Sequence, residues 1–170
     1  MDKEFLYRLE STLKDIRNTL LLNENIRTLL YYDSADLADS QEVPAMELVA
    51  DNILLRPVVE IDNDELANKK VFMTVSMPTM SFTSENSVDY AIKITIMADK
   101  TAWNYQNQNG DTCIRLYRLA QEVINELEGK KYSIAGKIYF SQMLETVLDK
   151  TIVGKSLLFY AEEGVGDGDN

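Results

Sequence analysis

The residues that come closest to a nucleotide-binding motif are the consecutive Gly154, Lys155 and Ser156. A P-loop places another glycine five residues before the glycine of this triplet, so that backbone amides can wrap the phosphates. Asp149 occupies that position. The triplet also opens a predicted strand, whereas anions favour the amides of a helix N-terminus. The sequence therefore predicts ordinary strand residues here and no nucleotide site.

A second candidate for chemistry is a group of acids, Glu60, Asp62, Asp64 and Glu65. The spacing of Asp62, Asp64 and Glu65 resembles the start of an EF-hand calcium loop, but Ala67 replaces the glycine of the turn and no glutamate closes the loop at its twelfth position. Glu60, Asp62 and Asp64 alternate at a strand end, which places two of them on one face, as in the paired carboxylates of glycosidases. We expect a solvated strand end, and a metal-dependent enzyme using the acids of residues 60 to 65 stands as an alternative function.

Nucleophilic catalysis has little support in the composition. The chain has no histidine and one cysteine, Cys113, which excludes an internal disulfide, a zinc site built from thiolates and the usual proton shuttle at neutral pH. Cys113 precedes a predicted helix, whose dipole favours a thiolate, but without a histidine base we interpret it as a packed residue. We expect no catalytic residue, no metal and no cofactor, and hence no enzyme.

Length and hydropathy set the class of protein. A chain of 170 residues that is 45% hydrophobic can bury enough surface to form one compact domain. No run approaches the roughly 20 apolar residues of a membrane helix, and the start MDKEFLYRLE lacks the features of a secretory signal. We expect a protein that is made and kept inside a cell and does not contact membranes.

The net charge of −11 is concentrated in one segment. Residues 1–32 hold five acids and five bases, whereas residues 33–68 hold ten acids against Arg56 alone and so contribute −9. Without a basic patch, tight binding of nucleic acid through its phosphates is disfavoured. The acidic segment is either a solvated loop or a surface that faces a polyanion without holding it.

The first third of the chain predicts two helices and a loop. Apolar residues at spacings of three and four predict a helix over residues 3–21, with Phe5, Leu6, Leu9, Leu13, Ile16 and Leu20 on its apolar face. A second helix is predicted over residues 24–32, with Asn23 as its N-cap. Residues 33–51 then form an acidic loop that contains Pro44.

Three strands are predicted next. Residues 52–61 read as an extended run in which Pro57 lacks a backbone donor, so this strand belongs at a sheet edge. Residues 71–77 and 87–98 alternate as two strands of a hairpin joined by the turn residues PTMSFTSEN. One face of this hairpin is expected in the core and the other in water.

The last third predicts a helix and two more strands. Asp111 or Thr112 caps a helix that stops at Gly129. Its predicted apolar face consists of Ile114, Tyr117, Ala120, Val123, Ile124 and Leu127. Strands are predicted over residues 132–140 and 152–161, with a helical turn or loop over residues 142–150 between them.

These elements predict an α+β fold. We expect a mainly antiparallel sheet of about five strands with helices packed on one face and a helical pair at the N-terminus. The predicted organisation is a single domain over residues 1–162, made of the helical pair 1–32, the acidic loop 33–51 and the sheet and helix of residues 52–162. Residues 163–170 read as a flexible acidic tail.

The second half of the chain resembles the tail terminator, or tail-completion, family of tailed bacteriophages. The resemblance covers roughly residues 50–162 through the segments SVDYAIKITIMADKTAW, IRLYRLAQEVINELEG, IAGKIYF and GKSLLFYAEE. It includes a strand that ends near Trp103, a helix with Arg115 early in it and Gly136 within the next strand. The N-terminal helical pair and the acidic loop are longer than this family requires, which leaves a neighbouring neck or head-completion protein open.

The resemblance implies a structural virion protein without catalytic residues. Such subunits close into a ring, commonly a hexamer, that terminates the tail tube at the head–tail junction and lets DNA pass. The implied partners are other copies of the chain, the tail tube protein and the neck or connector proteins, with transient contact to passing DNA. A non-ring accessory binding domain is the alternative from another class.

Two surfaces follow as expectations for such a ring. We expect subunits to meet at the sheet edge that contains Pro57 and at the loop near Trp103, because open strand edges join subunits. We expect the acidic segment, represented by Asp36, Asp39, Glu42 and Glu47, to face either the DNA channel or a basic neck partner. The apolar stripe of the first helix packs either on its own domain or on a neighbour, with its own domain favoured.

Overall fold

The computed structural model of the chain describes residues 3–32, 42–56, 69–84, 87–106, 111–132 and 136–162. Its helical elements are α1 (Lys3–Leu22), α2 (Glu24–Tyr31), α3 (Met46–Val49), α5 (Arg115–Leu127) and two short 3₁₀ turns, η1 (Ala50–Asn52) and η3 (Lys100–Ala102). Its strands are β1 (Ile53–Leu54), β2 (Val71–Ser84), β3 (Ser87–Asp99), β4 (Asn104–Gln106), β5 (Thr112–Ile114), β6 (Lys131–Tyr132), β7 (Gly136–Val147) and β8 (Ile152–Glu162).

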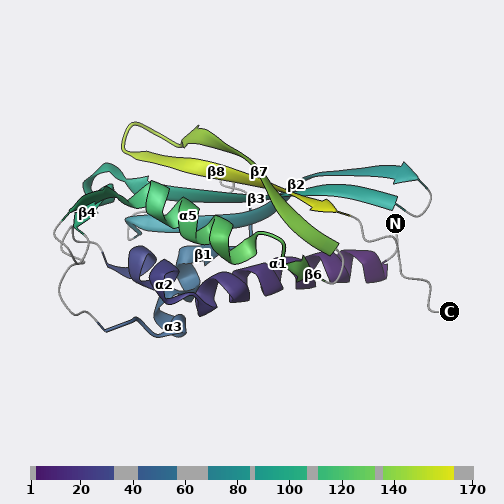
Figure 1. Ribbon diagram of the computed structural model, residues 1–170, viewed down its shortest axis with the longest axis horizontal. Helices are drawn as coiled ribbons and strands as arrows, with labels where there is room; N and C mark the ends of the chain where they lie inside the picture. Colours follow the sequence, from purple (N-terminus) through teal and green to yellow (C-terminus); the bar gives the residue numbers. More distant parts are fainter. Residues whose placement is uncertain are drawn as a thin grey trace.

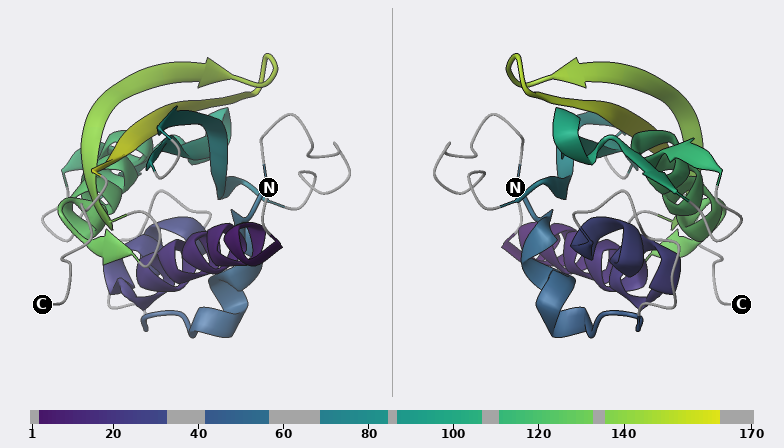
Figure 2. Two further views of the ribbon diagram at one scale, coloured as in Figure 1. Left: turned by 90° about the vertical axis from the view of Figure 1, so that its right-hand side faces the viewer. Right: turned by 90° about the vertical axis from the view of Figure 1, so that its left-hand side faces the viewer.

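The fold is α+β, as predicted. Six strands form one sheet in the order β1-β2-β3-β8-β7-β6, and β4 and β5 form a separate two-stranded sheet. Every pairing is antiparallel except that of β1 with β2. Figure 1 shows α1, α2 and α5 on the same side of the sheet, and Figure 2 shows that the sheet curls, with its β7–β8 hairpin arching over α5.

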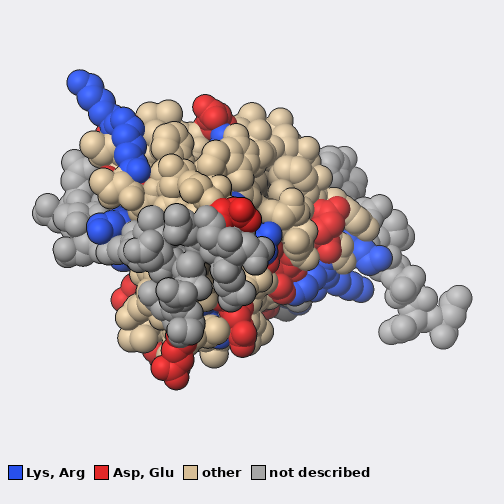
Figure 3. Space-filling model, turned by 60° about the vertical axis from the view of Figure 1, so that its left-hand side comes forward, with Lys and Arg blue, Asp and Glu red and all other residues tan. Residues whose placement is uncertain are grey.

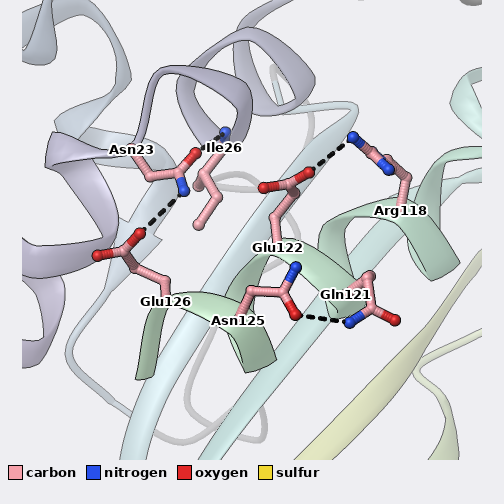
Figure 4. A network of polar contacts seen from close by, with 7 residues as sticks. All are labelled: Asn23, Ile26, Arg118, Gln121, Glu122, Asn125 and Glu126. Carbon is pink, nitrogen blue, oxygen red and sulfur yellow. Dashed lines mark hydrogen bonds and ion pairs between the residues drawn. The ribbon is translucent and has the colours of Figure 1, made fainter. Parts of the chain in front are cut away.

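The two N-terminal helices lie where the hydrophobic periodicity predicts them. Ile16 and Leu20 of α1 are fully buried in the main core, so this helix packs on its own domain. Asn23 is the predicted N-cap of α2, since its Oδ1 accepts a hydrogen bond from the Ile26 N–H at 3.0 Å. Its Nδ2 donates to Glu126 Oε2 at 3.0 Å, which joins the start of α2 to α5 (Figure 4).

Helix α5 differs from its prediction at its N-terminus and in its buried face. The helix begins at Arg115, because Thr112 to Ile114 pair as β5 with β4, so neither Asp111 nor Thr112 is the cap. Ile114 and Tyr117 are exposed. The apolar residues that α5 buries are Leu116, Leu119, Ala120, Val123 and Leu127. Gly129 follows the helix with φ 71°, the left-handed conformation that a helix stop requires.

The hairpin of β2 and β3 is longer and more buried than predicted. Strand pairing continues through most of the predicted turn, as far as Ser84 with Ser87. The expectation that one face of the hairpin is solvent-exposed is wrong at the end away from the turn, where residues 71–76 and 94–98 are all buried. On the face away from the helices, Phe72 and Met97 form a second small cluster, against which Leu54, Leu148 and Ile152 pack.

Two further loop predictions are wrong. The segment predicted as a loop around residues 142–150 is mostly strand, because β7 continues to Val147 and pairs with β8. The predicted acidic loop contains α3 and η1. The predicted strand over residues 52–61 is seen only at Ile53 and Leu54, and its continuation through Pro57, like the predicted tail, lies outside the described residues. Among the described helices, none is long and apolar enough to span a membrane.

Candidate assembly surfaces

The outer edge of β7 is paired along only a short part of its length. β6 pairs with Gly136 and Lys137 alone. Ile138 then exchanges backbone hydrogen bonds with Gly129 and Lys130 at 2.8 and 3.1 Å, and the Phe140 N–H donates to Glu128 Oε2 at 2.6 Å. From Ser141 to Val147, no other strand in the described part of the chain adjoins this side of β7. We call this stretch the open β7 edge.

The ladder with β8 determines which backbone groups the open β7 edge presents. The Leu148 N–H bonds inward to the Ile152 carbonyl at 3.1 Å. Backbone groups that point toward β8 and away from it alternate along an antiparallel strand. The N–H and C=O groups of Leu144 therefore point toward β8, and those of Met143, Glu145 and Val147 point away from it. The open β7 edge therefore offers the hydrogen-bonding pattern of an unpaired strand.

The side chains beside this edge are apolar and exposed. Val147 is 70% exposed, and Met143 and Leu144 are also exposed. Tyr139 and Tyr160 add two exposed rings on the same hairpin. Monomeric proteins commonly place lysine or proline on an exposed edge strand, because these residues prevent pairing with another chain. The open β7 edge has neither residue.

The one charge on this edge is neutralised within the subunit. Glu145 forms an ion pair with Lys155 of β8 at 2.6 Å. The hydrogen bond from Lys155 holds the pKa of Glu145 below its ordinary value, and the bond to Glu145 raises the pKa of Lys155. The Lys155 ammonium also lies 4.7 Å from the ring centroid of Tyr117 on α5. The open β7 edge therefore carries no uncompensated charge.

These contacts also explain the Gly-Lys-Ser triplet as strand residues of β8. Gly154 lies where β3 and β8 approach so closely that a Cβ would meet the Ile96 carbonyl oxygen at 2.1 Å. The Ser156 hydroxyl lies 3.1 Å from that of Thr95 and 2.5 Å from that of Thr146. Each member of the triplet thus has a role within the sheet.

A second unpaired feature is the far end of the β2–β3 hairpin. β8 pairs with β3 only from Ala91 onward, and β1 pairs with β2 only at Met73 and Thr74. Beyond a register shift at Pro78, Thr79–Ser84 and Ser87–Tyr90 therefore form a ribbon of two strands, which we call the β2–β3 arm. In Figure 1 the arm projects past β7 and β8 at the right, whereas the β7–β8 turn lies at the left.

Two hollows lie on opposite faces of the subunit. One of about 300 Å³ is on the sheet face away from the helices, lined by Pro78, Ala91, Lys93, Leu144, Leu158 and Tyr160. The other, of about 340 Å³, lies between α1 and α3 and is lined by Arg17, Asn18, Leu21, Leu22, Met46, Glu47 and Ala50. The walls of both are mainly apolar, and in the second the Arg17 side chain donates a hydrogen bond to the Ala50 carbonyl at 2.6 Å.

The sequence-predicted site residues are only partly described. Glu42 and Glu47 are exposed, and Figure 3 shows acidic groups along the lower part of this side, at the level of α3 in Figure 1. Trp103 is 38% exposed, at the end of η3 just before β4, and so lies off the six-stranded sheet. Asp36, Asp39 and Pro57 lie outside the described residues.

Sequence reasoning missed the buried role of Arg115. This side chain is fully buried, and its Nη1 donates to the carbonyls of Leu29 at 3.2 Å and Tyr32 at 2.5 Å. These carbonyls belong to the C-terminal end of α2, where a cation is favoured by the helix dipole. A signal was available, because Arg115 precedes Leu119 and Glu122 at helical spacing on the buried side of α5.

The candidate metal and nucleophile residues are not assembled into a site in the described part of the chain. No group of three or more cysteine, aspartate or glutamate side chains there is arranged to hold a metal ion. Glu60, Asp62, Asp64 and Glu65 lie outside the described residues. Cys113 is half-buried in β5, and its thiol lies 3.7 Å from the Asp111 carbonyl oxygen.

Comparison with known proteins supplies a family. A search of curated proteins finds no match. The sequence model of the family described as YomW matches residues 23–160, from the cap of α2 to the last residues of β8. The name of this family resembles that of a phage-region gene product, which indicates a phage-associated protein. Because the match covers most of the 170 residues, the chain belongs to the YomW family.

Proposed function

We propose that this protein is a structural subunit of a phage particle that closes into a ring at the head–tail junction. In this role it terminates the tail tube, joins the tube to the neck and leaves a channel for DNA. The observation that carries the proposal is the surplus of strand edge on a small α+β subunit: the open β7 edge and the β2–β3 arm both lack a partner strand among the described residues.

The physical argument starts from what such edges do. Unpaired strand edges are templates for another chain, and proteins that remain monomeric blunt them with charge, proline or a covering segment. The segment SQMLETV of the open β7 edge has no proline and one acid, which Lys155 neutralises. A contact between two different surfaces of identical subunits closes into a ring when the rotation permits.

The acidic segment supports a channel in this ring. Residues 33–68 carry −9, and the acids among them that the structure describes, Glu42, Glu47 and Asp51, are all exposed. Duplex DNA carries one negative charge per about 1.7 Å, so a basic wall would bind it by releasing counterions and slow its passage. An acidic wall lets the duplex pass on a hydrated layer, provided that it lies within the screening length of about 8 Å.

The mass of the purified protein tests the ring. We expect light scattering at high concentration to give close to six times 19.4 kDa. A monomer at every concentration, together with the absence of a ring from virions, would contradict the proposal.

Loss of the gene from the phage tests the position of the ring. A terminator stops growth of the tail tube, so we expect tubes of uncontrolled length without heads when the protein is missing. Headless tails of normal length would instead assign the protein to the neck, next to an intact terminator. Electron microscopy of lysates distinguishes the two results.

Charge reversal tests the channel. We expect lysine at Asp36, Asp39, Glu42 and Glu47 to leave the ring mass unchanged and to slow or block DNA ejection from assembled particles, measured by dye release. Loss of docking to the neighbouring neck ring with unchanged DNA transit would show that the acidic segment is a partner interface.

A further inference from the structure

The β2–β3 arm lacks a third strand. Its outer strand, Thr79–Ser84, pairs with β3 on one side and with no other strand among the described residues on the other. A two-stranded ribbon is at best marginally stable in water, and three strands are needed for independent stability. The arm therefore gains stability from any strand that adds to it.

The open β7 edge matches the arm in length and charge. The arm presents six residues of β2, and the open β7 edge presents the seven residues Ser141–Val147, roughly 20 Å in each case. The arm strand reads TMSFTS and has no charge. Glu145 is the one charge of the β7 stretch, and Lys155 neutralises it. Pairing these two strands brings no like charges together.

The positions of the two edges exclude pairing within one subunit. β3 and β8 separate β2 from β7 in the sheet. The arm projects at one end of the molecule, and the turn that follows the open β7 edge lies at the other end (Figure 1). Pro78 lies in the first register shift, before the arm begins, so its missing N–H does not affect the arm strand. A second register shift, between Phe82 and Ser84, leaves Thr79–Phe82 as the regularly paired part of that strand.

We propose that the arm of one copy adds to the open β7 edge of the next copy, so that the six-stranded sheet continues across each subunit boundary. This inference rests on the proposed ring, to which it assigns the contact. The contact joins two different surfaces, so repetition leads around a ring. Main-chain hydrogen bonds supply the binding, as in other cases of strand addition.

Two variants remove one partner each. In the arm-less variant, Asn-Gly replaces residues 81–89 directly after Met80, which keeps the Met80 to Tyr90 pair and closes it with a two-residue turn. In the edge variant, Met143→Pro removes an N–H that points outward, where proline is tolerated. Leu144→Pro is the control, because it removes an N–H directed at β8 and should destabilise the subunit itself.

We expect the wild type to form a ring and the arm-less and edge variants to be folded monomers by circular dichroism and light scattering. An equimolar mixture of the two variants should form a one-to-one heterodimer, since the mixture retains one intact arm and one intact edge that can meet. Should Met143→Pro fail to fold, Val147→Lys takes its place, because a lysine on the edge also prevents strand addition.

The outcomes separate this inference from the proposed function. A wild-type chain that stays monomeric overturns both the ring and the contact. A ring that survives in both variants overturns the arm contact and leaves the ring standing. An arm-less variant that still forms dimers, lost on Met143→Pro, means that β7 pairs with β7 and also overturns the contact.

Discussion

The centre and the periphery of the six-stranded sheet differ in how completely they are paired. At the centre, β3 and β8 have neighbours on both sides over most of their length, and Ile94, Ile96, Leu157 and Phe159 are fully buried. At the periphery, the β2–β3 arm has two strands and β7 has one bare edge. At the centre, backbone groups find partners and apolar side chains are buried within the subunit, whereas at the periphery some of each remain exposed.

This difference distinguishes residues that stabilise the subunit from residues that are available to bind other subunits. Substitutions at the centre should unfold the subunit, because close-packed interiors have no room for added atoms and little tolerance for lost partners. Substitutions of groups that the periphery directs outward should leave the fold intact and change only what the subunit binds. The following predictions test whether the boundary between these two regions lies where the structure places it.

The largest effect is expected for Gly154→Ala at the centre. The added Cβ would lie 2.1 Å from the Ile96 carbonyl oxygen and 2.5 Å from Met97 Sδ, so β8 must move away from β3. We expect a loss of about 3 kcal/mol in the free energy of unfolding, measured with urea. A loss below about 1 kcal/mol would mean that the centre relaxes easily, and the contrast with the periphery would fail.

Gly129→Ala is the matched control. Nothing lies within 4 Å of its added Cβ, so any loss in the free energy of unfolding comes only from the backbone angle φ of 71°. We expect about 1 kcal/mol for this backbone strain. The difference between the two alanine variants then measures the crowding between β3 and β8.

A smaller effect is expected for Arg115→Met, which tests the link between α2 and α5. Methionine fills similar space but leaves the carbonyls of Leu29 and Tyr32 without this donor. We expect a loss of about 2 kcal/mol in the free energy of unfolding, the scale of a buried hydrogen bond from a charged group. Lys14→Met, which breaks an exposed pair with Glu10, should leave the unfolding midpoint unchanged. Equal effects would assign no special role to Arg115.

The helices and the base of the hairpin could be predicted because each has one buried face. Leu9, Ile16 and Leu20 recur at helical spacing, and Ile92, Ile94 and Ile96 alternate along β3. The ends of the strands could not be predicted for the opposite reason. The segment SQMLETV belongs to an edge whose two faces are both exposed, so no burial imposes alternation on its sequence.

The candidate site was predicted less well than the fold. The sequence placed the assembly edge at Pro57, which lies outside the described residues, whereas the open edge that the structure describes is on β7. Trp103, the other residue expected at a subunit contact, is exposed, and its role in assembly stays a prediction. Edge position depends on strand order, and strand order in an antiparallel sheet is set by long-range packing that local sequence does not encode.

The smallest effect is expected at the turn between β7 and β8, where Asp149→Asn tests how closely the periphery is coupled to the centre. The Asp149 carboxylate accepts hydrogen bonds from the N–H groups of Thr151 and Ile152 at 2.6 and 2.8 Å. These backbone hydrogen bonds, with that from the Thr151 hydroxyl, hold the pKa of Asp149 below its ordinary value. Its contribution to stability is therefore present above the unfolded pKa of about 3.9 and is lost as the pH falls through the lower folded value.

Asp99 makes the same kind of turn at the end of β3 and provides the matched comparison. Its carboxylate accepts hydrogen bonds from the Thr101 hydroxyl and N–H at 2.6 and 2.8 Å, and these bonds lower its pKa. We expect Asp99→Asn to reduce the global unfolding midpoint slightly at pH 7, with the difference from wild type shrinking on acidification. Asp149→Asn should instead speed hydrogen exchange only in residues 143–153, because local opening of a peripheral hairpin requires less free energy than global unfolding. If both variants shift the global midpoint equally, the β7–β8 turn unfolds together with the centre, and the open β7 edge is as rigid as the core that supports it.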